Sequence, residues 1–169
     1  NEVLMQENQT DPLTGLGNRR AFHLAIDEVL SSRRYQPVCI ARIDVDHFKK
    51  YNDTYGHLEG DQVLKKLGQV LNRCTREQDT VIRFGGEEFS VIMPGSSLEE
   101  SQVLAERLRA AVEKECFPNQ SVTISIGVSS RTMDDDIESL LKRADEALYA
   151  AKAKGRNCIA TEQEELGSD

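Results

Sequence analysis

The sequence has few cysteines, and their spacing excludes the usual metal-binding and disulfide frameworks. The 169-residue chain has four, dozens of residues apart, with no CxxC pair and no histidine at zinc-finger spacing. We expect four ordinary thiols in a reducing compartment. They are Cys39, Cys74, Cys116 and Cys158.

The chain also lacks a long apolar run and an excess of positive charge. No segment approaches the roughly 20 apolar residues of a membrane helix, and no basic segment followed by an apolar one marks a signal peptide. With 21 Lys and Arg against 29 Asp and Glu, the net charge is −8, which disfavours a nucleic-acid or membrane-surface binder. We expect a cytoplasmic domain that contacts neither, which leaves open a membrane anchor in a longer parent protein.

Composition and length are those of one globular domain. Hydrophobic residues make up 38% and charged residues 30% of the chain, which excludes wholesale disorder. Because the chain begins with Asn1 rather than methionine, we expect a piece of a longer protein. We expect residues 1–9 to end an upstream signalling helix, residues 10–161 to form the domain, and residues 162–169 to be a disordered acidic tail.

Apolar periodicity alternates between helical and strand patterns. It predicts helices over residues 18–32, 47–55, 60–74, 98–114 and 137–154. It predicts strands over residues 38–44, 80–84, 88–94, 121–130 and 157–161. Gly85-Gly86 between two strand patterns predicts a hairpin, which requires an antiparallel pair. The sequence therefore predicts an α/β fold, an α+β sandwich with a mixed sheet.

Two aspartates lie at the end of the first predicted strand. Asp44 and Asp46 are two residues apart, so strand alternation puts both side chains on one side. The free N–H groups of the next helix start at about His47, Phe48 and Lys49, and carboxylates beside a helix N-terminus suit a Mg²⁺-triphosphate. A plainer alternative is that Asp46 only caps the helix. Asp44 ends an apolar strand, where a carboxylate needs a partner.

The predicted hairpin carries Glu87 and Glu88 directly after its two glycines. The glycines allow close approach of a ligand or a backbone, although a solvated charged turn would explain the same residues. If the strands at residues 38–44 and 88–93 are sheet neighbours, Asp44 and Glu87 converge. Two acidic groups from two strands, beside a helix N-terminus, predict a metal site for phosphoryl transfer.

Two pairs of polar residues can bind parts of a nucleotide. Lys152 and Arg156 lie four residues apart at the end of the last helix, where they either clamp a phosphate or only offset the helix dipole. Asn52 and Asp61 flank a turn at Gly56, and an amide with a carboxylate can recognise a guanine edge. Each pair taken alone leaves its structural alternative open.

Together these segments resemble the GGDEF domain, the catalytic domain of bacterial diguanylate cyclases. Residues 85–89 carry the GGEEF form of its signature, an accepted active variant, and residues 11–20 look like its DxLTGLxNRR start. Residues 44–57 look like its DxDxFKxxND and GH segment, and later motifs match at residues 125–127 and 147–157. The resemblance implies a nucleotide-cyclase or polymerase-palm fold, with a central mixed sheet surrounded by helices.

The resemblance also implies roles for single residues, with two Mg²⁺ or Mn²⁺ ions for each GTP. Asp44, Glu87 and the Val45 carbonyl would hold metal, and Glu88 would be a further ligand or the base that deprotonates a 3′-hydroxyl. The implied phosphate-binding groups are the main-chain amides of His47 and Phe48 with Lys49, Lys152 and Arg156. Lys49 joins the three acids as an implied catalytic residue, and Asn52 with Asp61 would recognise guanine.

The implied reaction joins two GTP molecules into cyclic di-GMP and releases two pyrophosphates. Each domain holds one GTP, so two copies must meet as a homodimer, under the control of an upstream sensory domain. Arg76 and Asp79 form an RxxD motif at the place of the family's inhibitory site for its product. Arg107 is expected to supply a second guanidinium to a neighbouring copy.

Two other functions remain open. One is a catalytically silent domain that binds GTP or cyclic di-GMP as a receptor, although silent members usually lose the acids that this chain keeps. The other is a related palm-fold enzyme that makes a different cyclic nucleotide. Asp61 favours guanine over adenine, because a carboxylate facing adenine would meet the acceptor at N1.

Overall fold

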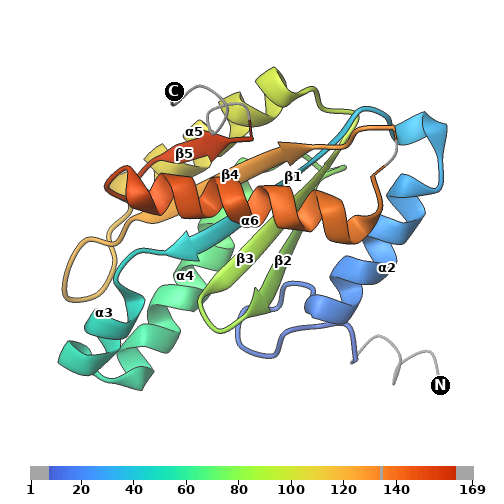
Figure 1. Ribbon diagram of the computed structural model, residues 1–169. Helices are drawn as coiled ribbons and strands as arrows, with labels where there is room; N and C mark the ends of the chain where they lie inside the picture. The colour runs from blue at the N-terminus through green and yellow to red at the C-terminus, as the bar shows by residue number, and fades with distance from the viewer. Residues whose placement is uncertain (1–7, 134, 163–169) are drawn as a thin grey trace.

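The computed structural model describes residues 8–133 and 135–162 (Figure 1). The helices of this part are α2 (Arg19–Leu30), the 3₁₀ helix η1 (Arg33–Tyr35), α3 (Phe48–Tyr55), α4 (His57–Cys74), α5 (Leu98–Lys114) and α6 (Ile137–Ala153). The strands are β1 (Val38–Val45), β2 (Thr80–Gly85), β3 (Glu88–Pro94), β4 (Ile124–Ser130) and β5 (Ile159–Thr161). Within the described residues, no helix has the length and apolar character needed to span a membrane.

The strands form one sheet in the order β2-β3-β1-β4-β5. The central strand β1 is antiparallel to β3 on one side and to β4 on the other, while β5 pairs with β4 in parallel. The predicted mixed sheet is thus confirmed, with β1 and β3 as neighbours. All eight residues of β1 are buried because helices cover both of its faces.

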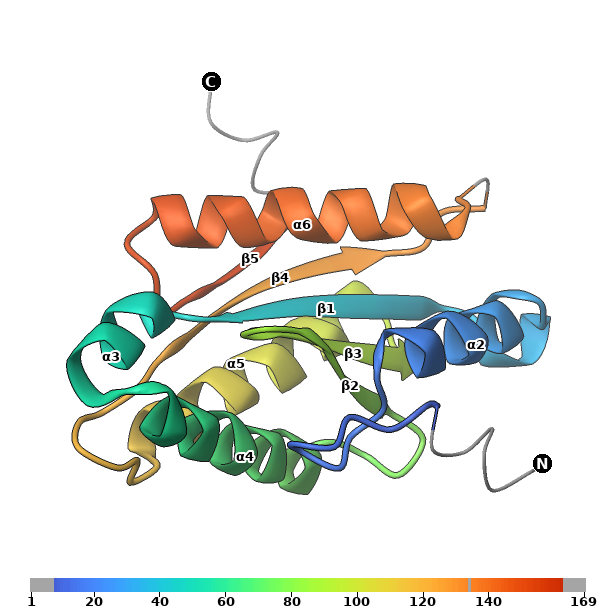
Figure 2. The ribbon, with the colours of Figure 1, turned by 90° about the horizontal axis from the view of Figure 1, so that it is seen from below.

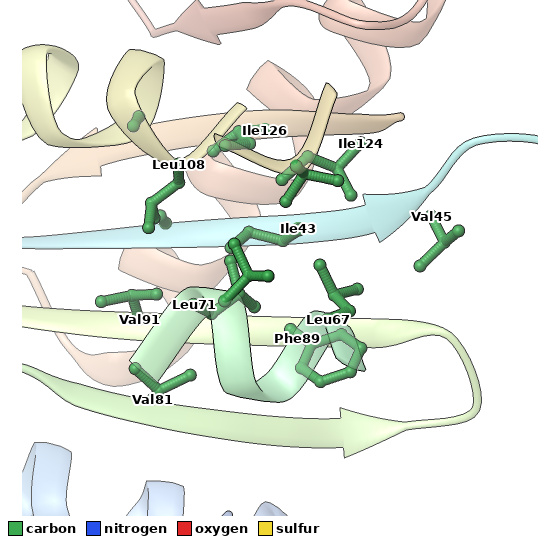
Figure 3. Close-up of a cluster of buried hydrophobic side chains, with 14 of the residues drawn as sticks. Ile43, Val45, Leu67, Leu71, Val81, Phe89, Val91, Leu108, Ile124 and Ile126 are labelled. Carbon is green, nitrogen blue, oxygen red and sulfur yellow. The ribbon is translucent and has the colours of Figure 1, made fainter. Parts of the chain in front are cut away.

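Two layers of helices cover the sheet (Figure 2). α4 and α5 lie over one face, and α6 with α2 lies over the other. The odd-numbered residues of β1 belong to the larger core beneath α4 and α5, part of which Figure 3 shows, while Val38 and Ile40 belong to the smaller core beneath α2 and α6. Strand alternation therefore points Arg42 and Asp44 toward the α6 layer.

A glycine allows α6 to lie directly against β4. A Cβ atom on Gly127 would come within 2.1 Å of the backbone nitrogen of Leu148 and 2.4 Å of the carbonyl oxygen of Ala144. A larger residue would therefore push the helix away from the strand. This close packing fixes the height of α6 above the sheet and brings its last turn, with Lys152, to the end of β1.

The predicted helix boundaries hold closely, with one shift. Asn18 caps α2 as expected, since its side chain accepts a hydrogen bond from the Ala21 N–H at 3.0 Å. α4, however, begins at His57 and not at residue 60. The reason is Gly56, whose φ of 92° ends α3 and leads directly into α4 without a side-chain cap.

Two predicted strands are shorter than expected. β5 begins at Ile159 and not at residue 157, because Arg156 and Asn157 have φ angles of 64° and 47°, outside the range of strands. β4 begins at Ile124, the partner of the last residue of β1, so its ladder ends where β1 ends. Most of the expected upstream helix (residues 1–7) and most of the expected acidic tail (residues 163–169) lie outside the described residues.

Candidate active site

The end of β1 places Asp44 among residues of three other elements. In the sheet, Asp44 is paired with Glu88 of β3 and with Ser125 of β4. Its side chain is buried, and one carboxylate oxygen accepts a hydrogen bond from the ammonium group of Lys152 at the end of α6. The other oxygen, Oδ1, is buried and has no hydrogen-bond partner among the described residues. A buried carboxylate with a free oxygen has room for one more cationic partner.

Glu87 faces this carboxylate from the β2–β3 hairpin. Its pKa is raised to about 7, first because burial disfavours the charged form, and then because the nearby charge of Asp44 favours the neutral form. Lys152 partly opposes this rise. The hairpin and β1 are also joined by a hydrogen bond from the Val45 N–H to the Glu87 carbonyl at 3.4 Å. The structure thus brings Asp44 and Glu87 together, as the sequence predicts for sheet neighbours.

This pair of acids suits a divalent cation. Two carboxylates that repel each other, one with an unpartnered buried oxygen, are stabilised when a cation lies between them. Among the described residues, no group of three or more His, Cys, Asp or Glu side chains is arranged to hold a metal ion. That finding is compatible with Mg²⁺, which usually takes one or two carboxylates and completes its shell with water and phosphate oxygens.

Glu88 lies at the edge of this group and points to a different partner. Its side chain is 51% exposed, and its Oε2 atom lies 3.7 Å from Nη2 of Arg42, whose side chain is only 9% exposed. Sequence reasoning missed Arg42. Its signal was a charged residue inside the apolar run VCIARID, where a buried cation needs a partner.

Asp46 does not cap α3, so that alternative is wrong. The N-cap position belongs to His47, which has a left-handed φ of 55° and makes no side-chain cap. The Asp46 carboxylate instead accepts hydrogen bonds from the hydroxyls of Thr123 at 2.7 Å and Ser125 at 2.6 Å, and from the Asn157 N–H at 2.9 Å. Asp46 therefore ties the end of β1 to β4 and to the loop that follows α6.

The loop after α6 carries Arg156 and is held in place from α5. The side chain of Asn157 accepts a hydrogen bond from Arg109 at 2.9 Å and donates one to Glu113. Arg156 itself is exposed and, like Asn157, has a left-handed backbone. Arg109 and Glu113 were not among the predicted site residues. Their spacing of four along a helix resembles any surface ion pair and gives no signal of its own.

The predicted guanine-binding pair lies on α3 and α4. Figure 1 shows the arrowhead of β1, the start of α3 and the last turn of α6 at the same side of the molecule. Asn52 of α3 has a buried side-chain oxygen that no donor within the described part of the chain reaches. A Cβ on Gly60 would lie 1.7 Å from that oxygen, so the two helices meet here, and Asp61 follows directly on α4. The structure thus places the predicted guanine-binding pair on facing helices.

Arg83 joins the hairpin at residues 85–86 to the N-terminal turn of the chain. Arg83 donates two hydrogen bonds to the Gly86 carbonyl, at 3.0 and 2.8 Å, and a third to Asp11 at 3.0 Å. The Arg83 N–H also donates to the Gly17 carbonyl at 2.9 Å. The turn at residues 11–17 is therefore joined directly to the tip that carries Glu87.

The predicted inhibitory residues lie apart from the acidic edge. Arg76 pairs with the fully buried side chain of Asp79 at 2.8 Å and donates to the Ser96 hydroxyl at 2.5 Å. Arg76 and Arg107 line one hollow of about 280 Å³, together with residues of α5, whereas Asp79 does not line it. Arg107 also donates to the Cys74 carbonyl at 2.8 Å. The structure brings the two guanidinium groups together in one chain and shows Asp79 engaged by Arg76.

The sheet order, the hairpin and the acidic end of β1 define the chain as a mixed α/β domain with a candidate metal and phosphate site. A family model described as "Diguanylate cyclase, GGDEF domain" matches residues 8–158. The chain belongs to this family, as its motifs predict.

Individual relatives agree with this assignment. Diguanylate cyclase DgcP of Pseudomonas aeruginosa is 42% identical over 158 residues, which cover 90% of this chain and 24% of that protein. Diguanylate cyclase A of Treponema denticola is 38% identical over 176 residues, which cover 98% of this chain and 47% of that protein. The crystal structure of the coiled coil and GGDEF domain of DgcB from Caulobacter crescentus, in complex with c-di-GMP, has a TM-score of 0.90 at 32% identity, covering 95% of this chain and 88% of that one. The chain thus spans a quarter to a half of the two curated relatives.

Proposed function

We propose that this domain is a diguanylate cyclase, which condenses two GTP molecules into cyclic di-GMP and releases two pyrophosphates. The observation that carries the proposal is the meeting of Asp44, Glu87 and Lys152 at the end of β1. Family membership supports the same reaction, and relatives that cover most of this chain are named diguanylate cyclases.

Asp44 and Glu87 would hold Mg²⁺ or Mn²⁺ with the Val45 carbonyl, two ions for each GTP when Glu88 contributes. The unpartnered Oδ1 of Asp44 and the raised pKa of Glu87 support this assignment. A bound cation would neutralise charge on the phosphates as it develops. Lys152, which donates to Asp44, is close enough to bind a phosphate that shares the metal.

The remaining residues around the edge would bind the rest of GTP. The N–H groups of His47 and Phe48 at the start of α3, with Lys49 and Arg156, suit the phosphates. The unpartnered oxygen of Asn52 and the nearby Asp61 suit the donors on the guanine edge. These groups orient the nucleotide, which supplies much of the rate enhancement in phosphoryl transfer.

The chemistry requires two domains, each with one GTP. The 3′-hydroxyl of one GTP attacks the α-phosphate of the other, so an O–P bond forms as the bond to the β-phosphate oxygen breaks and pyrophosphate leaves. The hydroxyl proton passes to a base, a role open to the partly exposed Glu88. Two such steps close the ring, and no nucleophilic side chain is needed. A homodimer, brought together by an upstream sensory domain, would provide this geometry.

Product inhibition would act through Arg76 and Arg107. Two guanidinium groups in one hollow suit a phosphate or a guanine edge of cyclic di-GMP. Because Asp79 is already paired with Arg76, product binding through both would require Arg76 to turn away from Asp79.

A chromatographic assay tests the proposal. The purified chain is incubated with GTP and Mg²⁺ over a range of protein concentrations, beside a Glu87→Ala control. We expect two pyrophosphates for each cyclic di-GMP formed, and a rate of formation that rises steeply with protein concentration. The Glu87→Ala variant should form no product. No product from the chain at any concentration, even after a dimerising coiled coil is fused at Asn1, would refute the proposal. Binding of cyclic di-GMP without turnover would favour the receptor function instead.

A further inference from the structure

Arg42 is a buried charge in the middle of the central strand. The residue is only 7% exposed and points toward the α6 layer, two residues before Asp44. Burying a guanidinium is unfavourable unless partners replace its water. An apolar side chain at this place would fit the apolar run of β1, so the partners of Arg42 indicate what the charge does.

Three elements fix the plane of the Arg42 guanidinium. Nε donates to Asp145 of α6 at 2.9 Å, and Nη1 donates to the Ser90 hydroxyl of β3 at 2.8 Å. The ring of Phe84, the last residue before the signature, has its centre 4.1 Å from Cζ, and Arg19 of α2 lies 4.7 Å from the same ring centre. These contacts leave little freedom for the guanidinium to turn.

The remaining nitrogen, Nη2, faces the signature acid Glu88. The sheet register pairs Arg42 with Ser90 and Asp44 with Glu88, so Glu88 is the diagonal neighbour of Arg42 on the adjacent strand. The separation from Nη2 to Glu88 Oε2 is 3.7 Å, which is within ion-pair range and too long for a hydrogen bond. The attraction therefore restrains the carboxylate without occupying its lone pairs.

Arg42 and Glu88 differ in how firmly their side chains are held. The Arg42 side chain is 9% exposed and held from three elements, whereas the Glu88 side chain is 51% exposed and close to solvent. A free glutamate of this kind samples several rotamers. The rigid partner therefore sets the position of the mobile one.

We infer that Arg42 is a positioning residue, which holds the Glu88 carboxylate at the reactive edge through its fixed guanidinium. This inference rests on the proposed cyclase function and gives Glu88 a defined orientation within it. The competing explanation is structural, in that Arg42 only joins β1 to α6 through Asp145.

The test combines Arg42→Met, Arg42→Lys, Glu88→Gln and the double variants. We expect Arg42→Met to lower kcat about tenfold while KM for GTP changes less than about threefold, since only the reacting geometry is disturbed. Arg42→Lys, which keeps a positive charge, should recover part of the loss. In the Glu88→Gln background, either Arg42 change should cause almost no further loss of kcat, because the group being positioned is gone.

Two controls separate positioning from stability. Arg131→Met removes a guanidinium that follows β4, beside the other end of β1, where it donates to the Leu30 carbonyl at 3.2 Å, and should leave kcat unchanged. Asp145→Asn removes the charge on α6 while keeping an acceptor for Arg42, and should cost less kcat than Arg42→Met. If Asp145→Asn matches Arg42→Met, or if the Arg42 and Glu88 losses multiply, the positioning role is wrong.

A second readout does not depend on turnover. Thermal unfolding in EDTA of the wild type, Arg42→Lys, Glu88→Gln and their combination measures the coupling of the pair directly. We expect the melting shifts to be less than additive, and additive shifts would overturn the inference. If the wild type itself makes no product, the cyclase proposal fails, and this cycle still decides whether Arg42 holds Glu88.

Discussion

Replacing Glu87 with glutamine should stabilise the metal-free domain above pH 7. Glu87 lies partly buried beside Asp44, and its pKa is raised to about 7, first by burial and then by the charge of Asp44. Between about pH 4.5 and pH 7, the folded state therefore holds a proton on Glu87 that the unfolded state has lost. Stability falls as the pH rises from about 4.5 through about 7, and the ionised side chain is unfavourable above that range.

The size of the effect follows from this shift. A rise from 4.5 to about 7 corresponds to about 3 kcal/mol. Because Glu87 is partly exposed, solvent screening reduces the effect to about 1 kcal/mol. For a domain of this size, that is an increase of about 2–4 °C in the melting temperature of Glu87→Gln.

Calorimetry in EDTA at pH 5 and pH 8 measures the melting temperatures of the wild type and of Glu87→Gln. The variant should gain at pH 8 and little at pH 5, where the native glutamate is already protonated. Glu88→Gln is the matched control. Glu88 lies beside the positive charge of Arg42, whereas Glu87 lies beside the negative charge of Asp44, so Glu88→Gln should bring no increase in the melting temperature. Added Mg²⁺ should raise the melting temperature of the wild type more than that of Glu87→Gln. A variant equal to or less stable than the wild type at pH 8 would refute this account of the acidic pair.

Three further changes test other parts of the site. Gly60→Ala puts a Cβ where the Asn52 oxygen lies and should weaken binding of a GTP analogue about tenfold, as measured by calorimetry, whereas unchanged binding would count against Asn52. Arg76→Ala should keep initial turnover and remove inhibition by added cyclic di-GMP in progress curves; persisting inhibition would exclude the hollow as the inhibitory site. Arg109→Met releases Asn157 and should raise KM for GTP about threefold, with an unchanged KM contradicting the role of that contact.

Much of the fold was predictable because its signals are local. The glycine pair at residues 85–86 predicts the antiparallel hairpin of β2 and β3, and the apolar run at residues 38–44 predicts a buried strand. The pairing of β1 with β3 was only a condition in the sequence analysis, and the structure supplies it. The convergence of Asp44 and Glu87 follows from that pairing alone. The motifs then identified the family without any tertiary information.

Contacts between segments that lie far apart along the chain could not be predicted from the sequence. Asp46 looks like a helix cap because its partners Thr123 and Asn157 lie 77 and 111 residues further along the chain. Arg42 likewise reads as an anomaly in an apolar strand until Asp145, 103 residues away, is brought beside it by α6. Local patterns carry no information on such pairs, which only the packing of α6 and β4 on β1 creates.

The most direct test of the central claim is the turnover of Asp44→Asn, which keeps the shape of the side chain and removes its charge. Cyclic di-GMP formation at saturating GTP is measured against Mg²⁺ concentration, beside the wild type and with thermal unfolding to check the fold. We predict Mg²⁺-dependent product from the wild type and a loss of at least about a hundredfold in the folded variant, since Asp44 would hold the metal. Turnover by Asp44→Asn equal to that of the wild type would contradict the assignment of the end of β1 as the active site.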